Sequence, residues 1–168
     1  VVSNTHDKNC IIWDLESGEL INSFKGHNEF VSYITITPDG KCAISGSGYD
    51  TSMFWSLHNC KLIKLLGKCS DKIDSIIITP DGKRALSFSL DHNWILWDLK
   101  TGLALKTLTE NGFKINAIIV TPDGENAVSI CQDGNCIIWN LKSGKILKRF
   151  VGSHSFESMA LYSKGIVI

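Results

Sequence analysis

Four tryptophans recur along this chain at a constant interval. They are Trp13, Trp55, Trp97 and Trp139, and each follows the previous one by 42 residues. Copies of one unit at a fixed spacing fold alike and pack against their neighbours in the chain, because every copy offers the same faces. The interval therefore predicts a repeat architecture over the whole chain.

A second landmark keeps the same period. The turn Thr-Pro-Asp-Gly ends at Gly40, Gly82 and Gly124, and a degenerate copy of it ends at Gly165. All three prolines of the chain lie in these turns. A period of about 40 to 45 residues that ends in Trp-Asp is typical of a four-stranded blade of a β-propeller.

One repeat, residues 83–124, shows how the strands are predicted. Segments 84–89 and 94–97 alternate small or apolar with polar residues around a tight polar turn, which indicates two antiparallel strands. A third strand is expected over 103–108 and a fourth, apolar on both faces, over 115–120. In the turn, proline presets φ and the glycine takes a positive φ. We therefore predict an all-β propeller of four blades with four antiparallel strands each, in one domain over 1–168 with repeat phases of about 1–40, 41–82, 83–124 and 125–168.

Several motifs resemble those of the WD-repeat family. They are Ser-x-Ser-x-Asp before the third strand, Trp-Asp-Leu-x-x-Gly after it, the dipeptide Gly26-His27 and the Pro-Asp-Gly turns. The style of the turns is also similar to that of propellers that follow the nucleotide-switch module in signalling NTPases of the NACHT and NB-ARC kind. The resemblance to the WD-repeat family covers the whole chain, whereas the second likeness is one of turn style only.

The resemblance implies a buried hydrogen-bond relay of His, Asp, Ser and Trp within each blade, since each desolvated polar group needs a partner. Tyr49 replaces a turn aspartate, Cys69 and Asn111 replace the histidine, and Cys60 replaces a turn glycine. Each blade is therefore expected to be stabilised by a different set of contacts. The structural residues that we assign from the family are Trp13, Trp55, Trp97, Trp139, Asp7, Asp91, Asp133, His27 and His154.

The phase of the repeat also bears on the number of blades. The first residues match the second strand of a blade, and the last residues match the start of that strand one period later. We expect this chain to be part of a larger, seven- or eight-bladed ring. Two alternatives stay open, which are a closed four-blade ring completed by residues 156–162 and a ring assembled from two chains.

Composition argues against several classes of partner. The chain has 17 basic and 17 acidic residues, which gives no net attraction to a polyanion and argues against nucleic-acid binding. Its apolar runs are far shorter than the roughly 20 residues of a membrane helix, so we expect no membrane partner. The chain has no Asn-x-Ser/Thr glycosylation site, which favours a cytoplasmic localisation. The cysteines, including Cys10 and Cys136 at one strand position of different repeats, are expected to be reduced. Lysines and one arginine mark the predicted outer strands, where they oppose edge-to-edge pairing, at Lys61, Lys64, Lys142, Lys145, Lys148 and Arg149.

No converging set of catalytic or metal-binding residues is apparent. The five histidines fall in turns and loops of different repeats, and the pair Cys131 and Cys136 lacks a second pair for zinc. Segment 45–48 is rich in serine and glycine but is not followed by the lysine of a phosphate loop. We therefore predict no catalytic residue, cofactor or metal. An enzyme or small-ligand binder that uses a central funnel is the alternative.

Loops at one end of the blades are the predicted partner site, because propellers present variable loops on a rigid frame. Phe30 and Leu90 are the expected apolar anchors, so Phe30→Ala with Leu90→Asp is expected to abolish partner capture. We predict a non-enzymatic protein-interaction scaffold or sensor; unconstrained drift would vary the loops equally, and an oligomerisation module is a further alternative. The candidate partner-binding residues are His6, Gly48, Leu90, Gln132, Phe30, Lys72, Lys114 and Ser155.

Overall fold

The computed structural model describes residues 1–4, 7–48, 51–68, 73–89, 93–108, 115–152, 159–162 and 165–167. Every regular element in these residues is a β-strand. Consecutive strands pair antiparallel along the chain, as the short polar turns between them require.

Three sheets have four strands each and follow the chain order. This confirms the prediction of an all-β fold built from WD-type blades. The strands are β4 (Val31–Ile36), β5 (Cys42–Ser47), β6 (Thr51–Ser56) and β7 (Leu62–Lys68); β8 (Ile73–Ile78), β9 (Arg84–Ser89), β10 (Trp94–Asp98) and β11 (Ala104–Leu108); and β12 (Ile115–Val120), β13 (Asn126–Cys131), β14 (Asn135–Asn140) and β15 (Lys145–Val151).

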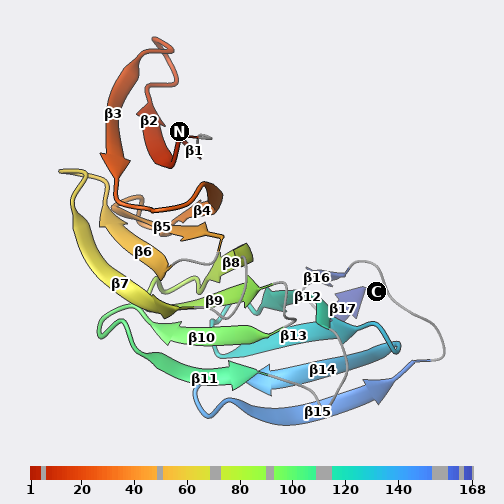
Figure 1. Ribbon diagram of the computed structural model, residues 1–168. Helices are drawn as coiled ribbons and strands as arrows, with labels where there is room; N and C mark the ends of the chain where they lie inside the picture. Colours follow the sequence, from red (N-terminus) through yellow and green to blue (C-terminus); the bar gives the residue numbers. More distant parts are fainter. Residues whose placement is uncertain are drawn as a thin grey trace.

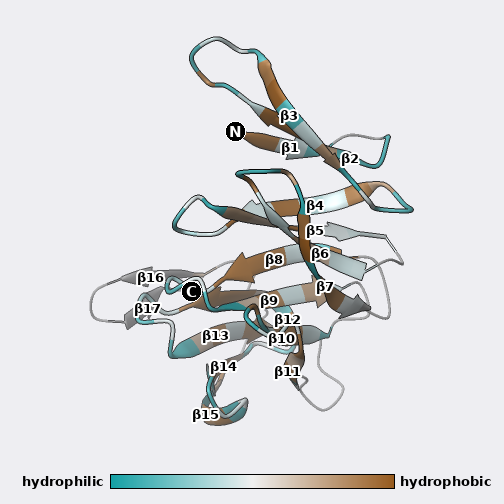
Figure 2. Ribbon diagram, turned by 90° about the vertical axis from the view of Figure 1, so that its left-hand side faces the viewer, coloured by the Kyte–Doolittle hydropathy of each residue, from teal (hydrophilic) through white to brown (hydrophobic). Residues whose placement is uncertain are grey.

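Two further sheets have fewer strands. One contains β1 (Val2–Asn4), β2 (Asn9–Trp13) and β3 (Leu20–Lys25), which correspond to the second to fourth strands of a full sheet, and the other pairs β16 (Ala160–Tyr162) with β17 (Gly165–Val167). A closed four-blade ring would place β16 beside β1. Among the described strands, β1 pairs only with β2, and β1 and β16 lie far apart (Figures 1 and 2). The four-blade ring is therefore wrong, because β16 finds its partner in the hairpin with β17.

The sheets follow one another in an arc, from β1–β3 to β12–β15 (Figure 1). The core lies between neighbouring sheets, where apolar segments of the strands face one another (Figure 2). Phe24 of β3 packs with Trp55 of β6, Leu66 of β7 with Trp97 of β10, and Leu108 of β11 with Trp139 of β14. The repeated tryptophan is thus the residue through which each full sheet packs on the sheet before it.

The Thr-Pro-Asp-Gly turns have the predicted backbone. Gly40, Gly82 and Gly124 have φ of 70°, 67° and 71°. Thr37 Oγ1 donates a hydrogen bond to Asp39 Oδ1 (2.6 Å) and accepts one from the Cys42 amide (3.0 Å), and the two later turns repeat this pattern. Hydrogen bonds of the threonine and aspartate side chains within the turn therefore stabilise each turn, which is why the motif repeats as a unit.

The outer strand of each sheet is its edge. β15 is exposed along its whole length and carries Lys145, Lys148 and Arg149. The predicted placement on edge strands is confirmed for Lys64 of β7 and for these three residues of β15, where the charge opposes pairing with another edge, whereas Lys61 and Lys142 lie in the turns before those strands.

Candidate interaction surface

Each of the four tryptophans donates a hydrogen bond to a serine ten residues earlier, on the neighbouring strand of the same sheet. Because the donor is an indole N–H in an apolar layer, an oxygen must be supplied for it, and the serine at the paired position supplies it. The Nε1–Oγ distances are 2.7 Å for Trp13–Ser3, 2.7 Å for Trp55–Ser45, 2.8 Å for Trp97–Ser87 and 2.8 Å for Trp139–Ser129. The Trp–Ser part of the family relay is thus present in every sheet that carries the tryptophan.

The sheet β4–β7 extends this pair. His27 is buried, and its Nε2 lies 2.6 Å from Ser45 Oγ, so one hydroxyl serves both Trp55 and His27. Cys10, on the preceding sheet, also hydrogen-bonds Ser45, and burial raises the pKa of its thiol to about 12. Cys10 is therefore a neutral core residue that links two sheets. Its link was not predicted, although its position three residues before Trp13 places it on the strand that faces Ser45.

The turn aspartates of two other repeats lie at the surface. Asp7 and Asp133 are exposed, and each accepts a hydrogen bond from the side chain of the asparagine two residues later, Asn9 and Asn135. The buried position that the family relay implies for them is therefore wrong, because local turn bonds satisfy these carboxylates. Asp91 and His154 lie outside the described residues.

Three candidate contact residues lie at the end of the sheets where β4 begins and β13 ends. Phe30 is 41% exposed, and its carbonyl accepts a hydrogen bond from Ser47 Oγ (3.0 Å). Gln132 is exposed, whereas Gly48, its counterpart two repeats earlier, is buried and offers no surface to a partner, which is a correction to its assignment. His6, Leu90, Lys72, Lys114 and Ser155 lie outside the described residues.

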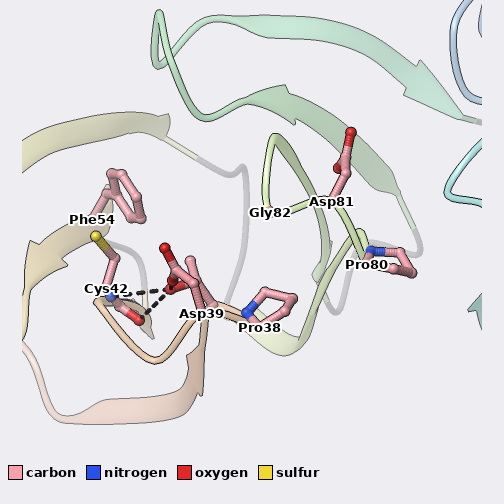
Figure 3. Close-up of a pocket in the computed structure, with 8 residues that line it drawn as sticks. Pro38, Asp39, Cys42, Phe54, Pro80, Asp81 and Gly82 are labelled. Atoms are coloured by element: carbon pink, nitrogen blue, oxygen red, sulfur yellow. Dashed lines mark hydrogen bonds between the residues drawn. The ribbon is translucent and has the colours of Figure 1, made fainter.

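A cleft of about 390 Å³ opens at the opposite end, between two successive Thr-Pro-Asp-Gly turns (Figure 3). Pro38 and Pro80 come from the two turns, and Phe54 and Cys42 lie beside them. The hydrogen bond from Thr37, together with that from the Lys41 amide, holds the pKa of Asp39 below its ordinary value. The carboxylate of Asp39 in the cleft therefore already accepts hydrogen bonds from groups of its own turn.

The chemistry of the cleft does not favour catalysis. Burial raises the pKa of the Cys42 thiol, which suppresses the thiolate that a nucleophile needs. Within the part of the chain that the structure describes, no three His, Cys, Asp or Glu side chains gather where they could hold a metal ion. The five described cysteines are free thiols, and Cys10, Cys131 and Cys136 are buried.

A search of the described residues for a helix long and apolar enough to cross a membrane finds none.

Comparison with known proteins agrees with the geometry. The family model "WD domain, G-beta repeat" matches residues 18–56 and 102–140, two periods apart. The small ribosomal subunit protein RACK1 of Caenorhabditis elegans is 39% identical over 56 residues, covering 28% of this chain and 17% of that protein. A guanine nucleotide-binding protein subunit beta of Dictyostelium discoideum is 38% identical over 47 residues, covering 28% of this chain and 14% of that protein.

Four in-phase Trp–Ser pairs, the repeated turns and these matches show that the chain contains repeats of the WD family. Members of this family typically serve as scaffolds for protein interactions. The matched segments span less than a fifth of the length of these relatives.

Proposed function

We propose that this chain is a non-enzymatic protein-interaction scaffold or sensor module of a larger cytoplasmic signalling protein. Its partner is another protein, which docks on the loops at the end of the sheets where β4 begins. The observation that carries the proposal is a constant frame with variable loop residues.

The constant part of the frame is hydrogen-bonded and buried. The Trp–Ser pairs and the Thr-Pro-Asp-Gly turns recur with nearly the same distances in successive sheets. A rigid sheet holds the attached loops in place at little entropic cost on binding, which is the condition for specific recognition.

The variable part lies at the loop end. Gly48 and Gln132 occupy one repeat position, yet one is buried and the other is exposed. Phe30 adds an aromatic ring with 41% of its surface exposed, and rings of this kind are enriched among residues that dominate binding energy. The two relatives are named as subunits of larger assemblies, which accords with a scaffold role here.

The test compares the two ends of β4. Phe30 precedes the strand and Ile36 ends it, and their exposed fractions are closely matched at 41% and 39%. We expect Phe30→Asp to weaken capture of protein partners at least tenfold, because a carboxylate at an apolar anchor is desolvated without a partner. Quantitative pull-down with the wild-type chain and with Ile36→Asp as the control measures this.

The proposal fails if Phe30→Asp and Ile36→Asp reduce capture equally, since the loop end would then have no special role. Circular dichroism of both variants verifies that the strands are retained.

A further inference from the structure

The outer strands of four sheets share a β-bulge at one repeat position. These strands, β3, β7, β11 and β15, line the outer side of the arc (Figure 1). In each of them the register against the tryptophan strand shifts beside the tryptophan, which leaves one residue of the outer strand without a residue opposite it. The four bulge residues, which we call the bulge belt, are Ile21, Ile63, Leu105 and Leu147, each 42 positions after the one before.

The bulge belt is apolar and exposed in every one of these sheets. The exposed fractions are 59% for Ile21, 47% for Ile63, 48% for Leu105 and 58% for Leu147. Ile63 and Leu105 belong to sheets that pack on a neighbouring sheet on each side. The packing of sheet on sheet therefore leaves the bulge belt uncovered in the middle of the arc as well as at its ends.

Strand structure alone does not require these side chains. A bulge re-aims the side chain of its extra residue, and a polar residue there would keep apolar surface out of water. Leu105 and Leu147 are not among the β-branched and aromatic residues that strands favour. What the four positions share is apolar size at the surface, and exposed apolar side chains that lie together mark interaction sites.

Lysine stems join the outer edges of neighbouring sheets. A lysine directly follows the bulge residue in three of the four sheets. Lys64 packs on Gly102 of the next sheet, and Lys106 packs on Gly144, so closely that a Cβ added to either glycine would overlap the lysine stem. Each glycine lies three residues before the bulge residue of its own sheet. The bulge residues of three successive sheets therefore lie along one continuous rim.

The strands of this rim are basic. The segments of β3, β7, β11 and β15 contain lysine and arginine but neither aspartate nor glutamate, although the whole chain has 17 residues of each sign. Lys64 donates a hydrogen bond to the Lys100 carbonyl, which accepts it without neutralising the charge. Lys106 and Lys148 are exposed. An apolar partner that carries carboxylates beside its apolar residues therefore complements the rim in both respects.

We propose that the bulge belt is a second docking surface, and that its occupant is an acidic amphipathic helix of another protein. Aliphatic residues on one face of the helix cover the bulge residues, and aspartate or glutamate beside them reaches the lysines. An added strand suits this rim poorly, because bulges and lysines oppose pairing at an edge. A helix satisfies its backbone hydrogen bonds internally and needs only the side-chain contacts that the rim offers.

The experiment titrates the chain with two fluorescently labelled synthetic helices and follows their anisotropy. The acidic probe carries leucines along one face with glutamates on both sides of them, and the basic probe has lysine in place of every glutamate. The wild-type chain is expected to bind the acidic probe at least tenfold more tightly than the basic probe, because only the acidic probe neutralises the rim.

Substitutions of the bulge belt test its apolar part. Ile63→Ser and Leu105→Ser are each expected to weaken binding of the acidic probe about tenfold, because each removes apolar area from the contact. Ile36→Ser is the matched control, at an exposed isoleucine (39%) that ends the inner strand β4, and is expected to bind like the wild type. Circular dichroism verifies that the variants remain folded.

A charge reversal tests the electrostatic part. Lys106→Glu is expected to weaken binding of the acidic probe and to strengthen binding of the basic probe, and opposite changes of this kind do not arise from loss of folded protein. Both changes are expected to shrink as the salt concentration rises, because the rim is exposed to solvent.

Four results would overturn the proposal. They are no measurable binding of the acidic probe, equal binding of the two probes, an equal loss in Ile36→Ser and Ile63→Ser, and binding of vesicles with anionic lipids but not of the acidic probe. Phe30→Asp is expected to bind the acidic probe like the wild type, since Phe30 lies at the loop end. The docking surface on the rim and the proposed scaffold function at the loops can therefore fail independently.

Discussion

At the scale of single residues, one hydroxyl group joins two sheets. Ser45 Oγ accepts a hydrogen bond from Trp55, lies 2.6 Å from His27 Nε2, and bonds the thiol of Cys10 on the preceding sheet. Ser129 holds the same position two repeats later, where it accepts a hydrogen bond from Trp139. These two serines therefore offer a matched pair in which the burial is the same and the number of bonded groups differs.

Ser45→Ala is expected to destabilise the chain by about 1–3 kcal/mol more than Ser129→Ala, because it leaves a second buried polar group without its partner. Urea unfolding followed by tryptophan fluorescence measures both variants against the wild type. Equal losses would show that His27 contributes nothing through Ser45.

At the scale of the elements, the turns after the tryptophan strands differ in backbone strain. Gly18, Gly102 and Gly144 occupy the turn between the last two strands of a sheet with φ of 72°, 75° and 64°, and Cys60 adopts a φ of 53° at the same position. The left-handed region costs a residue with a Cβ roughly 1–2 kcal/mol relative to glycine. In this turn, the second repeat therefore carries backbone strain that the other repeats avoid.

Cys60→Gly is expected to be more stable than Cys60→Ala by about 1 kcal/mol, since both variants lose the thiol and only glycine relieves the strain. This corresponds to a melting temperature about 2–4 °C higher for a chain of this size. Differential scanning calorimetry under reducing conditions provides the comparison, and identical melting temperatures would contradict the expected strain.

At the scale of the whole molecule, stability resides between sheets as much as within them. The buried clusters join one sheet to the next, and the strands β5, β9 and β13 are nearly continuous in burial. β1 holds the same place in its sheet as β13 but is only partly buried and has no described strand on its inner side. The arc is therefore expected to open from the β1–β3 sheet.

Hydrogen exchange of this chain is expected to be roughly tenfold or more faster in β1 than in β13, because β1 pairs with one described strand and is only partly buried, whereas β13 pairs with two strands and is almost wholly buried. Mass spectrometry of the wild-type chain makes the comparison. Equal exchange in the two strands would show that the open sheet is as stable as the enclosed one.

Much of the fold was predictable because the repeat specifies local structure. The 42-residue interval predicted the strands, the positive φ of Gly40, Gly82 and Gly124, and the charged outer strands, since turn chemistry and alternation act over a few residues. The structure contradicts the four-blade ring, which was one of the open alternatives, the buried position that the family implies for Asp133, and the exposed position expected for Gly48. Ring closure and the burial of a given residue depend on which segments pack together in space, and periodicity does not specify this.

The sequence by itself determined that this chain repeats one β-sheet unit of the WD type, because the spacing of tryptophan, serine, proline and glycine is a local property of each copy. Only the tertiary structure decided which side chains of each copy are covered by a neighbouring sheet. Leu15 and Leu141 are the same residue at the same repeat position, yet one is 78% exposed and the other is fully buried. Burial depends on the neighbouring sheet, and only the arrangement of the sheets in space determines which side chains that neighbour covers.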